Sequence, residues 1–123
     1  IVKQRAKASE IERMDLVGSV DGCDVIIVDD MVDTAGTLCK AAQMIKENGA
    51  RRVFAFCSHG VFSGPAAGRI AKSCLTELVV LDTIPLLPEL QATGKITQLS
   101  VGPLLAQAIY NLHNKKSISA LFK

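Results

Sequence analysis

Residues 29–37 combine side chains that could recognise a small anionic ligand, and they read Asp-Asp-Met-Val-Asp-Thr-Ala-Gly-Thr. They follow the apolar run at 25–28 and lead into a helical pattern. In an open parallel sheet, ligands bind in the crevice beyond the carboxyl ends of the strands, so an α/β domain would place its site here. Three carboxylates, two threonine hydroxyls and one glycine in that position indicate a sugar phosphate as the ligand.

Each part of this loop has a chemical task in such a site. Backbone N–H groups of residues 34–37 would surround a phosphate at the start of the next helix, where unpaired donors and the helix dipole favour an anion. A carboxylate accepts several hydrogen bonds, so Asp29 and Asp30 suit neighbouring sugar hydroxyls, while Asp33 could contact the sugar ring or a metal-bound water. Gly36 would let the backbone approach closely. The predicted ligand-binding residues are Asp29, Asp30, Asp33, Thr34, Ala35, Gly36 and Thr37.

Parts of this string have simpler interpretations. Acidic residues are common after buried strands, and a Thr or Asp before a helix is often only an N-cap. Two adjacent acids, a third acid and Thr-x-Gly-Thr seldom coincide on one strand–loop–helix unit, so the complete string favours a binding site. A phosphate-accepting receiver domain would need an Asp after its third strand and a Lys after its fifth, and a dinucleotide-binding domain would need Gly-x-Gly-x-x-Gly after the first strand. The sequence has neither pattern.

The elements that must position this loop follow from periodicity. Strands are predicted at 24–28, 53–57, 78–81 and 97–101, and helices at 37–48, at 64–73 and from 102 to about 113. Gly49 lies at the C′ position that closes the first helix. The last helix carries Leu105, Ala108, Ile109 and Leu112 on one face. This alternation predicts an α/β domain with three layers, a mostly parallel sheet with helices on both faces.

Composition limits the classes of function. A chain of 123 residues that is 49% hydrophobic, with a mean hydropathy of +0.30, can form one domain with a buried core. The net charge of +2 gives no field that would favour nucleic acid or an anionic membrane. No apolar run approaches the roughly 20 residues of a membrane span, and no leader opens the chain. We therefore expect a soluble, cytoplasmic protein.

Four cysteines, Cys23, Cys39, Cys57 and Cys74, contain no Cys-x-x-Cys pair. His59 and His113 are the two histidines that could join them at a metal. The spacing is typical of reduced core residues in an intracellular protein rather than of a zinc site or a disulfide framework.

The motifs together resemble the ribose-phosphate diphosphokinase family, also called phosphoribosyl pyrophosphate synthetases, which has the type I phosphoribosyltransferase fold. Residues 29–37 are similar to the family's ribose-phosphate loop. Supporting strings are Glu-Asn-Gly-Ala at 47–50, Ser-His-Gly-Val-Phe-Ser-Gly-Pro-Ala at 58–66, Leu-Ser-Val-Gly-Pro-Leu-Leu-Ala at 99–106 and Ser-Ile-Ser-Ala-Leu-Phe at 117–122. The resemblance is to the C-terminal portion of the enzyme, so residues 1–123 are expected to be one C-terminal domain without its upstream half.

The resemblance implies transfer of the diphosphoryl group of ATP to the C1 hydroxyl of ribose 5-phosphate, with Mg²⁺ as cofactor. Lys3 and Arg5 match two basic residues of the family's flexible catalytic loop, to which residues 1–10 would belong, and they would stabilise charge on the transferred group. Gln4 stands where many members have an arginine. Asp29 and Asp30 would contact the metal only indirectly.

At the C-terminus, the resemblance implies a regulatory nucleotide or phosphate site between subunits, formed by Ser117, Ser119 and Phe122, in a homo-oligomer of dimers that often assemble into hexamers. Ala120 departs from the tyrosine frequent there. The polar–apolar alternation of 117–122 by itself indicates an edge strand or a partner contact. For His59, packing, an anion contact or a subunit contact is favoured over acid–base catalysis.

Two alternatives remain open. A nucleobase phosphoribosyltransferase shares the first loop, but it should have a pyrophosphate-binding loop upstream and a base pocket downstream. A non-catalytic, synthetase-associated regulatory subunit would use the same fold as a scaffold. The intact acidic loop and the Lys3–Arg5 pair favour the active enzyme, although this chain without the upstream half is expected to be inactive.

Overall fold

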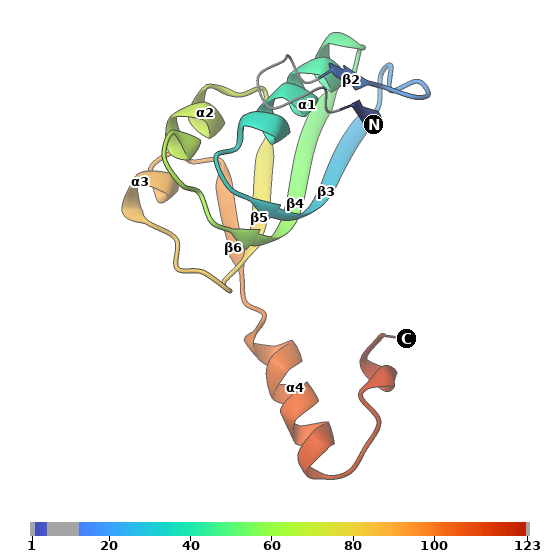
Figure 1. Ribbon diagram of the computed structural model, residues 1–123, viewed down its shortest axis with the longest axis vertical. Helices are drawn as coiled ribbons and strands as arrows, with labels where there is room; N and C mark the ends of the chain where they lie inside the picture. Colours follow the sequence, from blue (N-terminus) through green and yellow to red (C-terminus); the bar gives the residue numbers. More distant parts are fainter. Residues whose placement is uncertain (1, 5–12, 123) are drawn as a thin grey trace.

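The computed structural model describes the backbone of residues 2–4 and 13–15, and residues 16–122 with their side chains. The chain forms an α/β domain from which the C-terminal segment projects (Figure 1). Its elements are β1 (Val2–Gln4), β2 (Arg13–Asp15), β3 (Asp24–Val32), α1 (Gly36–Glu47), β4 (Arg52–Gly60), α2 (Ala66–Lys72), β5 (Glu77–Leu81), α3 (Pro88–Gln91), β6 (Ile96–Leu99), α4 (Gly102–His113) and the 3₁₀ helix η1 (Ser119–Phe122).

The main sheet has four parallel strands in the order β3-β4-β5-β6, so the predicted α/β class with a parallel sheet is confirmed. Its strands are rich in β-branched and aromatic residues, as in the Val-Ile-Ile-Val run of β3. Strand order equals chain order throughout. Crossover connections between parallel strands are right-handed. When the strand order does not reverse, successive crossover helices therefore lie on the same face of the sheet.

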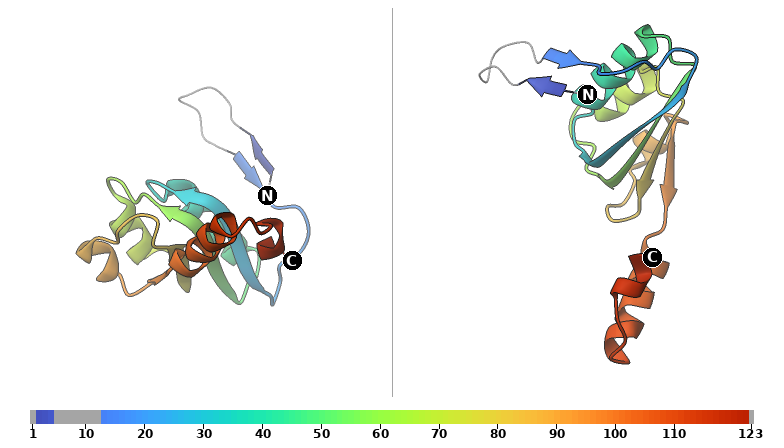
Figure 2. Two further views of the ribbon diagram at one scale, coloured as in Figure 1. Left: turned by 90° about the horizontal axis from the view of Figure 1, so that it is seen from below. Right: turned by 90° about the vertical axis from the view of Figure 1, so that its right-hand side faces the viewer.

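That face carries the hydrophobic core. Val53, Ala55 and Leu78 from the sheet are buried at 2% exposure or less and pack beneath Ile45 of α1 and Ile70 of α2. Leu90 of α3 joins the same cluster. The three helices therefore form one layer over one face of the sheet (Figures 1 and 2).

The opposite face differs from the sequence expectation of helices on both faces. Ile26, Val28 and Phe56 leave 58%, 78% and 41% of their surface exposed. No crossover helix among the described residues covers these side chains, because a crossover helix on this side would require the strand order to reverse. The described residues therefore give two layers, with one apolar sheet face open.

Helix α4 extends away from the carboxyl edge of the sheet (Figure 1). Its predicted bounds are confirmed, but the apolar face is exposed: Leu105 at 54%, Ile109 at 67% and Leu112 at 62%. The chain then turns back, and buried Asn111 donates from Nδ2 to the carbonyl oxygen of Ser117 at 3.1 Å. The alternative of an edge strand at 117–122 is wrong, because residues Ser119–Phe122 form η1.

At the N-terminal side, Val2–Gln4 pairs antiparallel with Arg13–Asp15. Part of the segment expected to be a loop is thus strand β1. Arg5 lies outside the described residues. Elsewhere, β3 and β4 run four and three residues beyond their predicted ends, to Val32 and Gly60, whereas Gly49 takes the expected C′ position with φ of 93°.

The four cysteines are free thiols, as expected. Cys57 is buried, Cys39 and Cys74 are partly buried, and Cys23 is exposed, so Cys23 is not a core residue. Burial raises the pKa of the Cys57 thiol to about 11, with a further contribution from the nearby Asp29 carboxylate. Among residues 13–122 and 2–4, no helix has the length and apolar character needed to cross a membrane.

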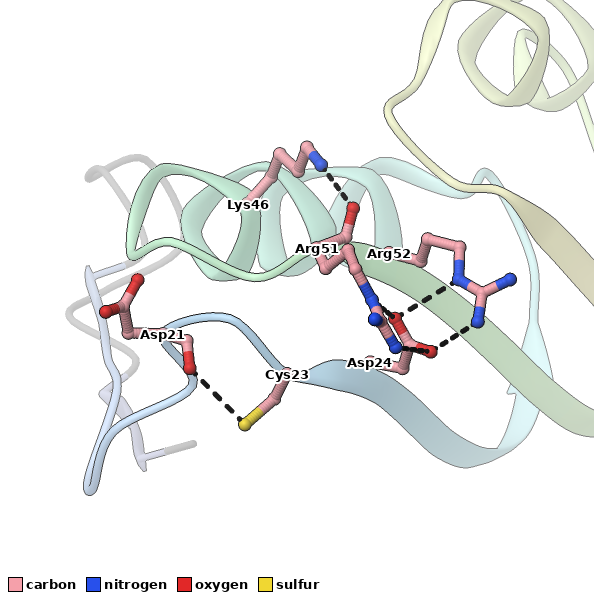
Figure 3. A network of polar contacts seen from close by, with 6 residues as sticks. All are labelled: Asp21, Cys23, Asp24, Lys46, Arg51 and Arg52. Carbon is pink, nitrogen blue, oxygen red and sulfur yellow. Dashed lines mark hydrogen bonds and ion pairs between the residues drawn. The ribbon is translucent and has the colours of Figure 1, made fainter.

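An ionic cluster joins the amino-terminal ends of β3 and β4 (Figure 3). Arg51 donates to both carboxylate oxygens of Asp24, from Nε at 2.8 Å and from Nη2 at 2.7 Å, and Arg52 bonds the same carboxylate. Lys46 of α1 donates to the carbonyl oxygen of Arg51 at 2.6 Å. Hydrogen bonds from Arg51, and then from Arg52, hold the pKa of Asp24 well below its usual range.

Replacing Leu78 by Ala should lower the free energy of unfolding by about 3 kcal/mol, because it removes a fully buried side chain and leaves a cavity. Urea unfolding followed by circular dichroism measures the loss. Val28→Ala, on the open face of β3, is the matched control and should change stability by under about 1 kcal/mol. Equal losses in the two variants would contradict the one-sided core.

The Asp24 cluster should make stability depend on pH. Because the folded-state pKa is depressed, its stabilisation is complete above the ordinary value of 3.8 and declines as pH falls below it. The stability difference between wild type and Asp24→Asn should therefore shrink from pH 7 to pH 3 in urea titrations. Glu89→Gln is the control, and a difference that stayed constant with pH would show that the cluster does not titrate as described.

Candidate functional site

The acidic loop lies at the carboxyl edge of the sheet, between β3 and α1. Asp29 and Asp30 belong to β3 itself, residues 33–35 form the turn, and Gly36 begins α1. Residues 29–38 line a concavity of about 300 Å³. All seven predicted ligand-binding residues thus border one cavity, although whether they bind a ligand remains a prediction.

The two adjacent acids are held by the backbone that follows them. Oδ1 of Asp29 accepts from the N–H of Asp30 at 2.9 Å, and Oδ1 of Asp30 accepts from the N–H of Met31 at 2.7 Å. The regular alternation of side chains along β3 breaks here, because Val25, Ile27 and Val32 all contact the core whereas Met31 is exposed. Both carboxylates are exposed and line the same concavity, so one ligand can contact both.

Ala35 marks the change from strand to helix. It has a left-handed backbone with φ of 59° and ψ of 8°, and it is only 5% exposed. This conformation costs an L-residue roughly 1–2 kcal/mol. Ala35 holds the N-cap position without a side-chain hydrogen bond, and its carbonyl accepts the first helical bond, from Cys39 N at 3.0 Å. Neither Asp33 nor Thr34 acts as an N-cap, which removes the simplest alternative for this string.

An uncapped helix start has the chemistry that an anion site requires. The first N–H groups of an α-helix find no acceptor within the helix, and the dipole makes this end positive. No acidic residue occupies the first turn of α1. The start of α1 is therefore suited to a phosphate, while the carboxylates lie on the strand side of the same cavity.

Two contacts from the next βα unit brace the turn, and sequence reasoning assigned neither. Ser63 Oγ hydrogen-bonds Oδ1 of Asp33. Arg69 of α2 donates from Nη1 to the carbonyl oxygen of Thr34 at 2.9 Å. Ser63 lies within a string already recognised at 58–66, but no local pattern pointed to Arg69.

Neighbouring loops at this edge are also tied together. Nδ1 of His59 lies 2.8 Å from Oγ1 of Thr83, which itself donates to the carbonyl oxygen of Ser58 at 3.1 Å. Asp82 accepts from the N–H of Val101 at 2.8 Å, and a hydrogen bond from Ser100, together with this backbone bond, lowers its pKa. His59 is exposed, and its role stays a prediction.

The other predicted site residues lie elsewhere. Lys3 is in β1, and Arg5 is outside the described residues. Ser117, Ser119 and Phe122 are on the segment after α4, beyond the α/β domain (Figure 1). Phe122 is 80% exposed. The ligand-binding set thus lines one cavity, and neither Lys3 nor the regulatory residues are among the residues that line it.

A larger groove, about 690 Å³, lies between α1 and α2 and is lined by residues such as Lys40, Met44 and Lys72. Size alone would favour it as the site. The loop is preferred because its smaller cavity holds three carboxylates and an uncapped helix start, which together match a sugar phosphate.

Comparisons with known proteins agree with this arrangement. Residues 3–123 match the phosphoribosyl synthetase-associated domain family. Ribose-phosphate pyrophosphokinase of Vibrio cholerae is 53% identical over 120 residues, covering 98% of this chain and 38% of the relative. The Bordetella pertussis protein of the same name is 55% identical over 122 residues, covering 99% and 39%. The chain thus spans less than two fifths of the length of these relatives.

A solved structure is also similar. The crystal structure of phosphoribosylpyrophosphate synthetase from Mycobacterium smegmatis superposes with a TM-score of 0.77 at 37% sequence identity. The alignment covers 80% of this chain and 33% of that one.

Ala35→Val should destabilise the domain by about 2–3 kcal/mol, because a β-branched side chain is strained at positive φ and does not fit a buried position. Ala35→Gly is the control and should be tolerated, since glycine adopts this backbone freely. Urea unfolding of the two variants measures the difference. A harmless valine would mean that the turn has another conformation in solution.

Proposed function

We propose, because this chain belongs to the phosphoribosyl synthetase-associated domain family, that it carries the ribose 5-phosphate site of a ribose-phosphate pyrophosphokinase. The observation that carries the proposal is the cavity at 29–38, where an acidic strand end meets an uncapped helix start. The whole enzyme would transfer the diphosphoryl group of ATP to the C1 hydroxyl of the sugar and release AMP. This chain corresponds to the C-terminal portion.

In this reading, the loop holds the acceptor. Backbone N–H groups of the turn and the first turn of α1 bind the 5-phosphate, with Thr34 and Thr37 contributing hydroxyls. Asp29 and Asp30 accept from sugar hydroxyls, and Asp33, held by Ser63, faces the ring or a metal-bound water. Fixing the sugar in this way supplies orientation, which is the main protein contribution to phosphoryl transfer.

Lys3 and Arg5 are proposed to stabilise charge on the transferred diphosphoryl group. The catalytic role would need the upstream half that the longer relatives have, and ATP as the second substrate. Lys3 lies in β1, at the N-terminal side of the domain.

The described residues could supply only some of the ligands of a Mg²⁺ ion, and water and substrate would have to supply the others. They contain no group of three or more His, Cys, Asp or Glu side chains that could hold a metal. Mg²⁺ is commonly bound through one or two carboxylates, several waters and substrate phosphates, and Asp29 and Asp30 suit such an ion through bridging waters. When bound, the ion would neutralise charge on the phosphates.

We further propose a homo-oligomer, with dimers as the basic unit and hexamers as a larger assembly, and a regulatory site at Ser117, Ser119 and Phe122. The exposed apolar residues of α4 and the exposed Phe122 support contacts of this segment with other polypeptide. No nucleic-acid or membrane partner is proposed. A cytoplasmic location accords with the reduced thiols.

The first experiment is titration of ribose 5-phosphate into this chain by calorimetry or NMR. Wild type should show saturable binding, and Asp33→Ala and Thr37→Ala should each weaken it at least about 10-fold, as expected for loss of a hydrogen bond to a charged group. Glu89→Ala, in α3, is the control. Retained affinity in both loop variants would exclude this cavity as the sugar-phosphate site.

The alternatives separate in a second assay on a protein that joins this chain to its upstream half. AMP release from Mg-ATP that requires ribose 5-phosphate supports the pyrophosphokinase. Consumption of phosphoribosyl diphosphate with a nucleobase would identify a phosphoribosyltransferase. If neither reaction occurs, the non-catalytic regulatory subunit is the remaining alternative.

A further inference from the structure

Arg69 contacts the backbone of the turn between β3 and α1. It lies in the last turn of α2, and its side chain crosses to the start of α1, where Nη1 donates to the carbonyl oxygen of Thr34 at 2.9 Å. Arg69 also lines a second concavity, of about 420 Å³, together with Thr34, Gly36, Thr37, Cys39 and Lys40. It does not line the cavity at 29–38, which shares Thr34, Gly36 and Thr37 with this second concavity.

A side chain at position 36 would crowd the contact of Arg69 with Thr34. Gly36 is not among the residues with positive φ, so the backbone there does not itself require glycine. A Cβ at this position would lie 3.1 Å from Nη1 of Arg69 and 3.7 Å from its Cζ. The absent side chain therefore leaves room for the guanidinium against the loop.

The hydrogen bond to Thr34 also fixes the next N–H group. In a trans peptide the C=O of one residue and the N–H of the next point in opposite directions. No cis peptide bond occurs among the described residues. With the Thr34 carbonyl held toward Arg69, the N–H of Ala35 must point away from Arg69. Ala35 lines the cavity at 29–38 but not the concavity beside Arg69.

The charge of Arg69 is available for this task. A guanidinium stays protonated at all ordinary pH values and has five N–H donors. Among the described residues, the recorded ion pairs are those of Asp24 with Arg51 and Arg52, and Arg69 makes none. Because its hydrogen-bond acceptor is a neutral carbonyl, the guanidinium of Arg69 keeps its positive charge beside Thr34.

We propose that Arg69 is a positioning residue for the sugar-phosphate loop, orienting the Thr34–Ala35 peptide so that the Ala35 N–H faces the phosphate. The inference rests on the proposed function for the identity of the ligand, but not for the orientation of the peptide. A second contact stabilises the same turn, because Ser63 hydrogen-bonds the side chain of Asp33, the residue before Thr34.

The test compares Arg69→Met and Arg69→Lys with wild type in the ¹H–¹⁵N NMR spectrum of the full chain, without ligand. In Arg69→Met the amide resonances of Ala35 and Gly36 should shift and their hydrogen exchange should accelerate, while the far-UV circular dichroism is unchanged. Arg69→Lys keeps one charged donor and should give a smaller effect. Lys72→Met, in the same turn of α2, lines only the groove between the helices and is the matched control.

Ribose 5-phosphate titration of the same four proteins then separates the two hypotheses. Arg69→Met should weaken binding about 10-fold, as expected for loss of a charge-assisted hydrogen bond, with partial rescue by Arg69→Lys and less than about 2-fold change in Lys72→Met. If wild type does not bind but the Ala35 amide shifts in Arg69→Met, the proposed ligand is wrong and the positioning of the turn is supported. Unchanged amides and unchanged affinity in Arg69→Met would overturn the role of Arg69 while leaving the proposed function intact.

Discussion

The candidate site depends on the turn at Ala35, where the chain passes from a paired strand to a helix. The strand ends at Val32 and the helix begins at Gly36, so the direction of the chain must change within three residues. The left-handed conformation of Ala35 makes this possible at a cost in strain. Such a conformation persists only when its surroundings over-determine it, and burial of Ala35 together with the contacts of Asp33 and Thr34 does so.

The bracing contacts come from the β4–α2 unit, so the loop geometry is a property of two adjacent βα units rather than one. Pairing of β3 with β4 continues as far as Val32 opposite Gly60, which brings the two loop starts together at the edge of the sheet. At the other edge, the Asp24 cluster ties the same two strands. The strand pair is thus fixed at both ends, and the site rests on this pair.

The domain has two apolar surfaces that its own described residues do not cover. One is the face of β3 and β4 with Ile26, Val28 and Phe56, and the other is helix α4 with Leu105 and Ile109. Exposed apolar patches are uncommon on a soluble domain and mark sites of interaction.

Local sequence determined the alternation of strands and helices, the C′ glycine at 49 and the position of the acidic loop at a strand end. These features depend on side-chain periodicity and turn chemistry within a few residues, which a single sequence displays. Only the tertiary structure decided the one-sided core, the projection of α4 and the contacts of Ser63 and Arg69 with the loop. The loop contacts join residues 30 and 35 positions apart, and the core follows from strand order, so neither leaves a local pattern in the sequence.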